Sequence, residues 1–501
     1  MNLLWCLVIC PLLFSLVILL IPSKKNAVLS WLSIVSVIIN LVLLSFLATS
    51  SHNTVPPAIH LFQTSFLTID FALDSLSWLL CLVCSLVWMF ASLFSIHYFE
   101  HENIKLLKRY QAFSLLNYWT VLLIFLATNF FTFFIFFELL LIVSYVLIIH
   151  YQTKEAFAAG IKYFFFQIIG GLFLFFGLVL TFSIIKTSDF IPGGYAALSS
   201  HPLFSLIFWC YIIGLSIKAG LFPLHIWLPE AHPVAPSPAS ALLSGMVIKT
   251  GSFGIFKVVV MLFGTSHLVG KVDITVLVVL SVLTMFWGSA VAIGQFHLKR
   301  VLAYSSVSQI GYILMGVSLL SPLSILGSLV HTVGHAFVKS TLFLSAGSMI
   351  ENTKQTDITK YNGYGQRNPV VFSAFTIGAL SMIGFPLFAN FISKWVLGMG
   401  IMEAFQLNYI PTWLMGLCLS MLMISSLLNA LYYTPILIRG WFYPVDENDK
   451  KPFHLSWSEA IPLCLLSLII IALFFFPHSW INPFINAISP TIPVETIVSP
   501  F

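Results

Sequence analysis

Charge is what this chain of 501 residues has least of. Only 8% of its residues are Asp, Glu, Lys or Arg, whereas 59% are hydrophobic. A soluble protein of this length needs more polar surface than that composition supplies, so soluble classes are excluded. The net charge of +5 is small, and no basic patch interleaved with aromatics indicates a nucleic-acid partner. The composition predicts an integral membrane protein.

Cysteine is also scarce, and the seven cysteines all lie within apolar runs. Cys81 and Cys84 form one C-x2-C pair without a second pair or a nearby histidine cluster, whereas zinc and iron–sulfur sites need about four ligands. No gap between apolar runs exceeds about 25 residues, which is too short for a nucleotide, flavin or iron–sulfur domain. We therefore expect no metal, no cofactor and no redox centre in this chain.

Apolar stretches of about 20 residues, long enough to cross a bilayer, recur along the sequence. The first, MNLLWCLVICPLLFSLVILLIP, lacks the basic start and the cleavage site of a signal peptide and is expected to be a span. The pattern predicts an all-α membrane fold of about fourteen transmembrane helices. The expected ranges are 3–22, 27–49, 74–97, 111–128, 130–150, 156–186, 203–222, 237–263, 272–294, 301–320, 322–350, 369–400, 410–439 and 459–479.

The basic residues predict how the helices are oriented. Loops after even-numbered helices hold only Lys186 and Lys271. By the positive-inside rule, the odd-numbered loops face the cytoplasm and both termini lie outside a cell (inner or plasma) membrane. The basic residues of the odd-numbered loops are Lys24, Lys25, Lys105, Lys108, Arg109, Lys154, Lys299, Arg300, Lys354, Lys360, Arg367, Arg439, Lys450 and Lys451.

Lysines inside the expected spans outnumber the carboxylates there. Glu138 is the one acidic residue in the middle of a span. Any single buried lysine could belong to a structural ion pair, but a structural set would balance its charges. We expect Lys257, near a helix end, to extend its amine to the surface. An excess of buried ammonium groups predicts that some lose their proton at some stage, as in a proton relay with Glu138 as a switch partner. The six lysines are Lys162, Lys218, Lys249, Lys257, Lys339 and Lys394.

Histidines extend this row. His331, His335 and Lys339 are spaced i, i+4, i+8, which places them along one helix face. An H-x3-H pair can bind zinc, but the glutamate of a hydrolytic H-E-x-x-H motif is absent. Proton exchange between histidines inside a membrane protein is the better interpretation.

Two proline breaks echo each other. Phe-Pro-Leu around Pro223 follows Lys218, and Phe-Pro-Leu around Pro386 precedes Lys394. Proline frees backbone carbonyls, which the membrane interior tolerates only beside protein or water. His225, just beyond Pro223, either links Lys218 to helix 8 or makes a structural hydrogen bond.

Lys162 and Lys339 form a second pair of matching positions. The members of each pair, like the two proline breaks, lie about five helices apart. Five is odd, so the two units would run oppositely through the membrane. We therefore expect two inverted five-helix repeats with broken helices 7 and 12. The expected parts are helices 1–3 (1–110), a first repeat (111–263), a second repeat (272–440) and helix 14 with a tail (441–501).

Together these segments resemble a known family, the antiporter-like, proton-conducting membrane subunits of respiratory complex I. Similar subunits occur in membrane-bound hydrogenases and in multi-subunit sodium/proton antiporters. The resemblance covers roughly residues 70–440 and rests on five segments: FFELLLIVSYVLI, KAGLFPLHIWLPEAHPVAPSPASALLSGMVIKTG, LKRVLAYSSVSQIGYILMG, GHAFVKSTLFLSAG and GFPLFANFISKW. Complex I relatives more often carry threonine at the position of Ser237. In this segment the chain most resembles the hydrogenase and antiporter branches. The chain ends about 20 residues after helix 14 and so resembles the members that lack a lateral helix.

The resemblance implies roles for individual residues. Glu138 and Lys218 correspond to an ion-pair switch, Lys249 to the central lysine and Lys394 to the charged exit position. The implied mechanism moves a proton laterally from Lys218 towards Lys394 when the Glu138–Lys218 pair opens or closes. Secondary positions that connect the two half-channels correspond to Lys162, His331, His335 and Lys339.

The resemblance leaves the partner complex open. The leading expectation is a proton-translocating subunit of a hydrogenase-linked or NADH–quinone oxidoreductase-like complex, with other membrane subunits and a peripheral redox arm as partners. The large subunit of a sodium/proton antiporter is the alternative, and sodium remains open as the transported ion. A stand-alone solute transporter needs hydrogen-bonding groups for a substrate, but the polar groups in the middle of the spans are nearly all titratable. A scaffold with a dead channel would not need all the relay positions.

Overall fold

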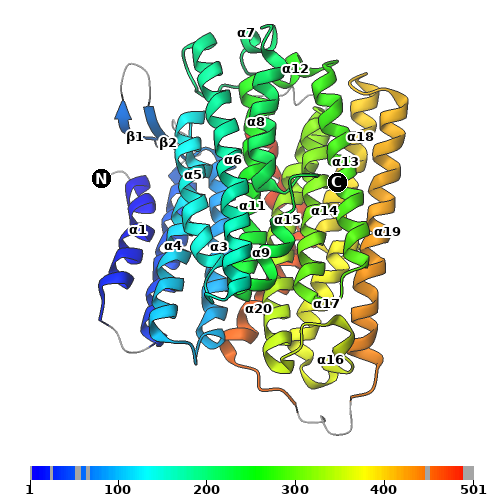
Figure 1. The fold of residues 1–501 in the computed structure, drawn as a ribbon. Helices are drawn as coiled ribbons and strands as arrows, with labels where there is room; N and C mark the ends of the chain where they lie inside the picture. Colours follow the sequence, from blue (N-terminus) through cyan, green and yellow to red (C-terminus); the bar gives the residue numbers. More distant parts are fainter. Residues whose placement is uncertain (1–2, 23–25, 51–57, 64–67, 446–451, 489–501) are drawn as a thin grey trace.

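The computed structural model describes the chain except residues 1–2, 23–25, 51–57, 64–67, 446–451 and 489–501. The described part is a bundle of long helices with one small hairpin at its edge (Figure 1). The first half comprises α1 (Leu3–Leu20), α2 (Asn26–Ser50), β1 (Ala58–Gln63), β2 (Thr68–Ala72), α3 (Ser75–Tyr98), α4 (Ile104–Leu126), α5 (Phe130–Ile148), α6 (Lys154–Ile185), α7 (Ala196–Ser199), α8 (Phe204–Ala219), α9 (Leu228–Val234), α10 (Ser237–Leu242), η1 (Leu243–Val247), α11 (Ile248–Lys257) and η2 (Val258–Phe263).

The second half comprises α12 (Thr265–Leu268), α13 (Val272–Ile293), α14 (Leu298–Ser318), α15 (Pro322–Thr353), η3 (Ile358–Lys360), α16 (Tyr364–Arg367), α17 (Pro369–Ile383), α18 (Ala389–Gln406), α19 (Thr412–Phe442), α20 (Trp457–Phe475) and α21 (Pro477–Ile488). Within the described residues, ten helices are long and apolar enough to cross a membrane, by length and composition. Each expected span coincides with a helix or a broken helix, which confirms the helical membrane fold.

Three differences from the expected elements have local causes. Helix α4 begins at Ile104 instead of residue 111, because the side chain of Asn103 accepts a hydrogen bond from the backbone N–H of Lys105 at 2.9 Å. An antiparallel hairpin, β1–β2, occupies a segment expected to be a loop, with Ala58 opposite Ala72. Helix α21 follows α20 directly where only a tail was expected.

The ends of the helices separate into two faces. The hairpin, α7 and α12 lie at the upper end of the bundle in Figure 1, and the described loops after the expected odd-numbered helices lie at the lower end. There the start of α14 meets the segment after α15, since the backbone N–H of Leu298 donates to Thr356 O at 2.8 Å. We call this lower end the basic face. Lys24, Lys25, Lys450 and Lys451, also assigned to it, lie outside the described residues.

Both expected helix breaks are present and have the same form. Helix α8 ends at a left-handed Gly220 (φ 87°), and α17 ends at a left-handed Gly384 (φ 92°). Glycine adopts this conformation without steric cost, and Pro223 or Pro386 follows within three residues, so neither helix continues. The chain then resumes as α9, where the sequence predicted only a turn, and as α18 after the expected break at Pro386. This likeness supports the inverted repeat, whose bounds stay a prediction.

The most polar helices form the centre of the bundle. The span from α10 to η2 and helix α14 are each 94% buried over their most apolar stretch, whereas the corresponding value for α6 is 33%. The central span is not a regular α-helix, because η1 and η2 are π-helical. Such π segments interrupt the regular hydrogen-bond ladder and often occur at functional sites.

Candidate functional site

Lys218 lies in the last turn of α8, directly before the first break. Its side chain is 1% exposed, and its Nζ donates a hydrogen bond to the carbonyl oxygen of Phe137 at 2.9 Å. The ammonium also lies 4.0 Å from the centre of the Phe137 ring. Helix α11 packs closely behind this turn, because a Cβ on Gly251 would lie 2.6 Å from the backbone nitrogen of Ala219. The lysine is thus held by backbone and ring contacts in the core.

Glu138 follows Phe137 on α5 and is half-buried against α6. Gly171 on α6 makes room for it, since an added Cβ would lie 2.5 Å from Glu138 Oε2. The ion pairs between described residues include neither Glu138 nor Lys218. Phe137 therefore connects the two expected switch partners, Glu138 and Lys218. No ion pair joins them in this structure, so we describe the pair as open.

Lys249 occupies the middle of the central span and is fully buried. Its Nζ donates to the carbonyl oxygen of Ser244 at 2.6 Å, within the π-helical segment η1. The hydroxyls of Ser244 and Ser306 lie 2.7 Å apart and connect this segment to α14. The irregular helix thus supplies a carbonyl that holds a buried ammonium.

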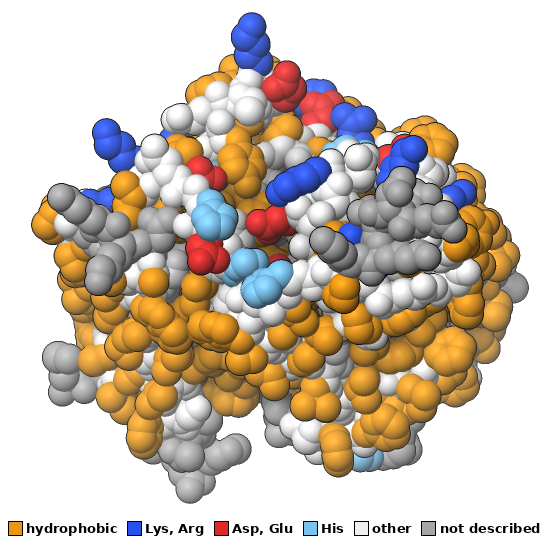
Figure 2. All heavy atoms as spheres, turned by 90° about the horizontal axis from the view of Figure 1, so that it is seen from below, with side chains coloured by type: hydrophobic (Ala, Val, Ile, Leu, Met, Phe, Trp, Pro, Cys, Tyr) orange, Lys and Arg blue, Asp and Glu red, His pale blue; other side chains and the backbone are white. Residues whose placement is uncertain are grey.

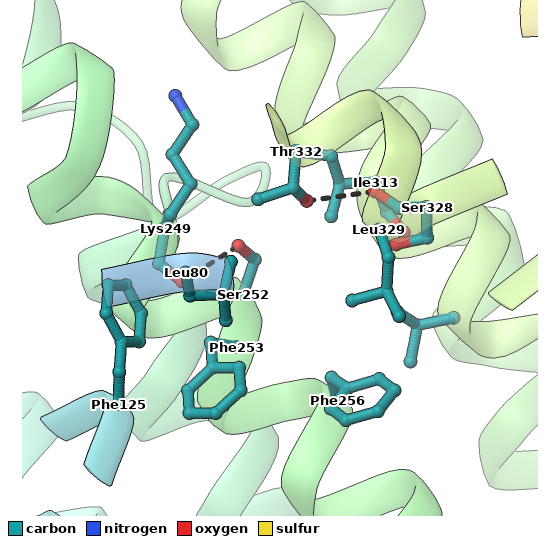
Figure 3. A pocket seen from close by; sticks show the side chains of 11 residues that line it. Leu80, Phe125, Lys249, Ser252, Phe253, Phe256, Ile313, Ser328, Leu329 and Thr332 are labelled. Atoms are coloured by element: carbon teal, nitrogen blue, oxygen red, sulfur yellow. Dashed lines mark hydrogen bonds between the residues drawn. The ribbon is translucent and has the colours of Figure 1, made fainter. Parts of the chain in front are cut away.

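A small pocket lies beside Lys249 between α11 and α15 (Figure 3). Ser252, Ser328 and Thr332 contribute hydroxyls to its wall, and Phe253 and Phe256 close its lower side. In Figure 3 the Lys249 amine points away from the two rings. The hydroxyls therefore make the wall of the pocket partly polar, while the amine itself binds Ser244 O.

His331 and His335 continue the row on α15. Their rings are stacked, with centres 6.0 Å apart and planes 11° apart. His331 is anchored at both nitrogens, by Ser393 Oγ at 2.7 Å and by Gln309 Oε1 at 2.9 Å. Both nitrogens of His335 are buried without a hydrogen-bond partner among the described residues. Buried polar atoms need a partner, so the surroundings of His335 call for water.

Lys339 lies one turn further along α15 and is fully buried. Its Nζ donates to the carbonyl oxygen of Leu302 at 2.9 Å and to Ser305 Oγ on α14. Ser305 Oγ in turn lies 3.1 Å from the hydroxyl of Tyr433. Lys339 is thus joined through hydroxyl groups to α19.

Lys394 lies at the second break. Its Nζ donates to the carbonyl oxygens of Met382 and Ile383, each at 2.9 Å, and to Ser426 Oγ at 3.0 Å. These carbonyls belong to the end of α17 that the break leaves open. The ammonium also lies 5.1 Å from the ring centre of Tyr312, and that ring stacks on His331 with centres 5.4 Å apart. Tyr312 therefore connects the histidine pair to Lys394.

Lys162 is not fully buried as expected, while its role as a connector stays a prediction. Its Nζ forms an ion pair with Glu230 Oε1 at 2.5 Å. The two side chains are 37% and 41% exposed, because α6 and α9 meet at the surface of the bundle. Glu230 thus supplies Lys162 with a carboxylate partner that had no signal in the sequence.

The sequence-based predictions for two other lysines are wrong. Lys257 is 3% exposed, with its Nζ 5.2 Å from the ring centre of Phe190 and 5.3 Å from that of Phe253, so it does not extend to the surface. Lys299, counted as a loop residue, is 6% exposed in the first turn of α14 and donates to the carbonyl oxygen of Ala235 at 2.9 Å. Both are packed inside the bundle.

His225 lies between α8 and α9 and is 5% exposed. Its ring stacks on Phe222 at 5.8 Å and lies 6.3 Å from the ring of Tyr304 on α14. Its Nδ1 is buried without a hydrogen-bond partner among the described residues. The structure therefore places it at the break, on the side of α14.

Neutral groups, which the sequence motifs did not identify, connect the charged ones. Ser305, Ser308, Gln309 and Tyr312 recur at helical spacing in LKRVLAYSSVSQIGYILMG and form a polar stripe on α14. That periodicity was a signal available in the sequence. Their partners on α18 and α19 are distant in the chain and could be found only in the fold.

The row can transfer protons but is not arranged to hold a metal. Ammonium, imidazole and hydroxyl groups exchange protons, and water completes such chains where partners are missing. The described residues contain no group of three or more His, Cys, Asp or Glu side chains that could hold a metal ion. No ion pair between them includes Lys218, Lys249, Lys339 or Lys394.

Comparisons with known proteins match this picture. The family described as "NADH:quinone oxidoreductase/Mrp antiporter, TM" matches residues 127–423. NADH-quinone oxidoreductase subunit M of Rickettsia prowazekii (strain Madrid E) is 28% identical over 80% of this chain and 78% of its own length. Hydrogenase-4 component B of Escherichia coli (strain K12) is 34% identical over 66% of this chain and 50% of its own length.

A solved structure shares the whole fold. A chain in the structure of the membrane-bound sulfane sulfur reductase, an archaeal respiratory membrane complex, superimposes with a TM-score of 0.85. The match covers 97% of both chains at 23% sequence identity. Both breaks and the central row therefore lie within a fold that is already known from a respiratory membrane complex.

Proposed function

This chain belongs to the NADH:quinone oxidoreductase/Mrp antiporter transmembrane family, and on that premise we propose that it translocates protons as one subunit of a multi-subunit respiratory-type membrane complex. One observation carries the proposal. Lys218, Lys249, Lys339 and Lys394 are all buried in the core, and no carboxylate of a described residue pairs with them. A permanently charged set of this kind would be strongly destabilising in a membrane, so protons must leave and return.

In the proposed mechanism the Glu138–Lys218 pair is the switch. Closing the pair would hold the proton on Lys218, because an opposite charge favours the charged form. Opening it, as in this structure, favours release of the proton towards Lys249. His335, His331 and Tyr312 then connect Lys249 to Lys394 at the second break. Lys162 stays a predicted connector, and His225 lies at the beginning of this row.

A sodium/proton antiporter is the second candidate, because the matched family includes Mrp antiporters. Sodium ions prefer several oxygen ligands, and the deep part of the row offers hydroxyl and carbonyl oxygens with one carboxylate, Glu138. That composition favours protons as the ions that move through the row. The two candidates differ in their partners, since a redox complex needs a peripheral arm that carries the electron-transfer centres.

We propose a cell membrane as the location, with the basic face towards the cytoplasm and both termini outside. The support is the distribution of Lys and Arg between the two faces, since cytoplasmic loops carry an excess of these residues. Other membrane subunits of the same complex are the expected partners.

The test is substitution of the switch in the complex as isolated from its native membrane. Lys218→Met and Glu138→Gln should each abolish ion-coupled activity while the complex still assembles, since each removes one charge of the switch. Lys105→Gln, an exposed position on the basic face, is the matched control and should retain full activity. Full activity of Lys218→Met would rule out the relay. Mass spectrometry of the co-purifying subunits distinguishes a redox complex from an antiporter.

A further inference from the structure

An open pocket lies on the basic face where α3, the segment after α5 and the end of α15 meet. Tyr98, Tyr151, Gly347, Glu351 and Lys354 line it. Its cavity volume is about 330 Å³, enough for several water molecules at roughly 30 Å³ each. None of these side chains belongs to the row described above, so the pocket needs its own explanation.

The pocket lies within a group of acidic and histidine side chains. Figure 2 shows Asp, Glu and His side chains gathered around a hollow on the face seen from below, with Lys and Arg among and beyond them. His97 lies 3.0 Å from Glu100 and 3.7 Å from Glu459. Glu459 also accepts a hydrogen bond from Ser348 Oγ at 2.6 Å. On a face otherwise rich in Lys and Arg, this group concentrates acidic and imidazole side chains.

Glu351 is the carboxylate that reaches into the pocket. Its Oε2 is buried and has no hydrogen-bond partner among the described residues. A buried carboxylate oxygen requires a donor, and water in the adjacent pocket is the available one. The charged and titratable groups around it come from several elements: Glu459 on α20, His97 on α3, His101 in the loop after α3 and Lys354 after α15.

The floor of the pocket is thin and polar. The hydroxyl of Tyr98 donates to Ser237 Oγ at 3.5 Å and accepts the backbone N–H of Ser237 at 3.3 Å. Gly347 lies against the same serine, because an added Cβ would be 2.6 Å from Ser237 Cβ. Ser237 begins α10, so this contact is where the basic face meets the start of the central span.

A buried histidine whose ring nitrogens have no hydrogen-bond partner among the described residues lies beyond this floor. His232, on α9, is 1% exposed and stacks on Phe343, one turn from Gly347 along α15, with ring centres 4.7 Å apart. Both of its ring nitrogens are buried without a hydrogen-bond partner among the described residues. Lys339 and Lys299 act on it electrostatically. The unpartnered imidazole therefore lies between the pocket and the first lysine of α15.

We propose that this pocket is the inlet through which protons enter the row from the basic face, with Glu351 as the group that takes them up. The Glu351 carboxylate accepts a proton from hydronium in the pocket, which leaves as water, and then returns that proton to an inner water molecule. The inner proton passes the Tyr98–Ser237 contact to His232 and on to Lys339. No atom other than the proton changes partner. The inlet rests on the proposed function, since it has a role only if the row moves protons.

The experiment uses the purified complex in liposomes, with a trapped pH indicator and a potassium diffusion potential as the driving force. Glu351→Gln should slow proton flux between about tenfold and a hundredfold, at or below what a positioned acid–base group contributes. Glu351→Asp should restore much of the flux, and so should a small weak acid such as formate added to Glu351→Gln. Glu155→Gln, an exposed carboxylate on the same face, is the matched control and should leave the flux unchanged.

The outcomes separate the inlet from the function. Normal flux in Glu351→Gln with lost flux in Lys218→Met would overturn the inlet and leave the proposed function intact. Normal flux in Lys218→Met would overturn the function itself. A slow Glu351→Gln variant that neither aspartate nor formate restores would assign Glu351 a structural role and overturn the inlet. An equal loss of proton flux in Glu155→Gln would show that surface charge in general causes the effect, and it would also overturn the inlet.

Discussion

Lys394 is held by backbone carbonyls instead of by a carboxylate. Two of its hydrogen bonds end on the carbonyl oxygens of Met382 and Ile383, at the open carboxyl end of α17. Asn429 contributes a further donor to Met382 O at 3.1 Å. The positive charge at the carboxyl end of α17 also opposes the partial negative charge of the helix dipole. One side chain thus combines a structural and a proton-exchanging role.

Lys394→Met is expected to change both properties at once. Loss of two charge-assisted hydrogen bonds to buried carbonyls should lower the free energy of unfolding by about 2–4 kcal/mol. The same variant should lose ion-coupled activity, because the row then ends at Tyr312. Thermal unfolding of the purified complex and a transport assay measure the two effects separately. Unchanged transport in a stably folded Lys394→Met variant would contradict the assignment of Lys394 to the row.

His150 provides a pH-dependent contribution to stability outside the membrane-spanning segments. It lies between α5 and α6, is fully buried, and makes ring contacts with Phe99 and Tyr110. Burial, with the neighbouring Arg109, lowers the pKa of His150 from 6.5 to about 4. The unfolded chain therefore binds a proton as the pH falls through 6.5, while the folded protein does not until about pH 4.

The expected result is a loss of stability of up to about 3 kcal/mol between pH 6.5 and pH 4 that originates at His150. Above pH 6.5 the residue is neutral in both states and contributes no pH dependence. His150→Phe should flatten the stability profile in that window, as followed by thermal unfolding at a series of pH values. An unaltered slope in His150→Phe would refute the assignment.

At the scale of single elements, the two breaks decide where the lysines lie. A continuous helix through residues 204–234 would satisfy its own carbonyls. Instead the carbonyl of Ile217 accepts a hydrogen bond from Trp227 Nε1 at 2.7 Å across the break. At the second break the corresponding carbonyls accept from Lys394. The breaks thus create buried carbonyl sites, and one of them is used by a lysine.

Gly384→Ala tests this element. Gly384 has φ 92°, and an alanine Cβ would lie 2.9 Å from Lys394 Cδ. The left-handed backbone costs an alanine about 1–2 kcal/mol, so the variant should unfold at lower temperature and transport less. Gly398→Ala on α18, whose Cβ would meet nothing within 4 Å, is the control. Since alanine favours a helix interior over glycine by about 1 kcal/mol, Gly398→Ala should be neutral or stabilising. A Gly384→Ala variant as stable as Gly398→Ala would contradict the strained break.

For the whole molecule, the sequence predicted the features that leave a periodic or compositional pattern in the order of residues. Apolar length placed the spans, and proline with glycine placed the breaks. It could not predict contacts between distant segments, such as the ion pair of Lys162 with Glu230 or the bond from Lys299 to Ala235. The open Glu138–Lys218 pair is of the same kind, because a difference of a few ångströms between charged groups has no signal in a single sequence.

The orientation of the molecule in the membrane gives the last prediction. The described basic residues gather on the face that carries the proposed inlet, so the inlet and the cytoplasm should be on the same side. Lys105 and Ser200 are exposed on opposite faces of the bundle. In intact cells a membrane-impermeant thiol reagent should label Ser200→Cys at once and Lys105→Cys only after the membrane is opened. The unsubstituted chain, whose cysteines at 6, 10, 81, 84, 210, 418 and 464 lie within helices, gives the background. Labelling of Lys105→Cys in intact cells would show that the basic face lies outside the cell. Proton uptake through Glu351 would then begin on that side.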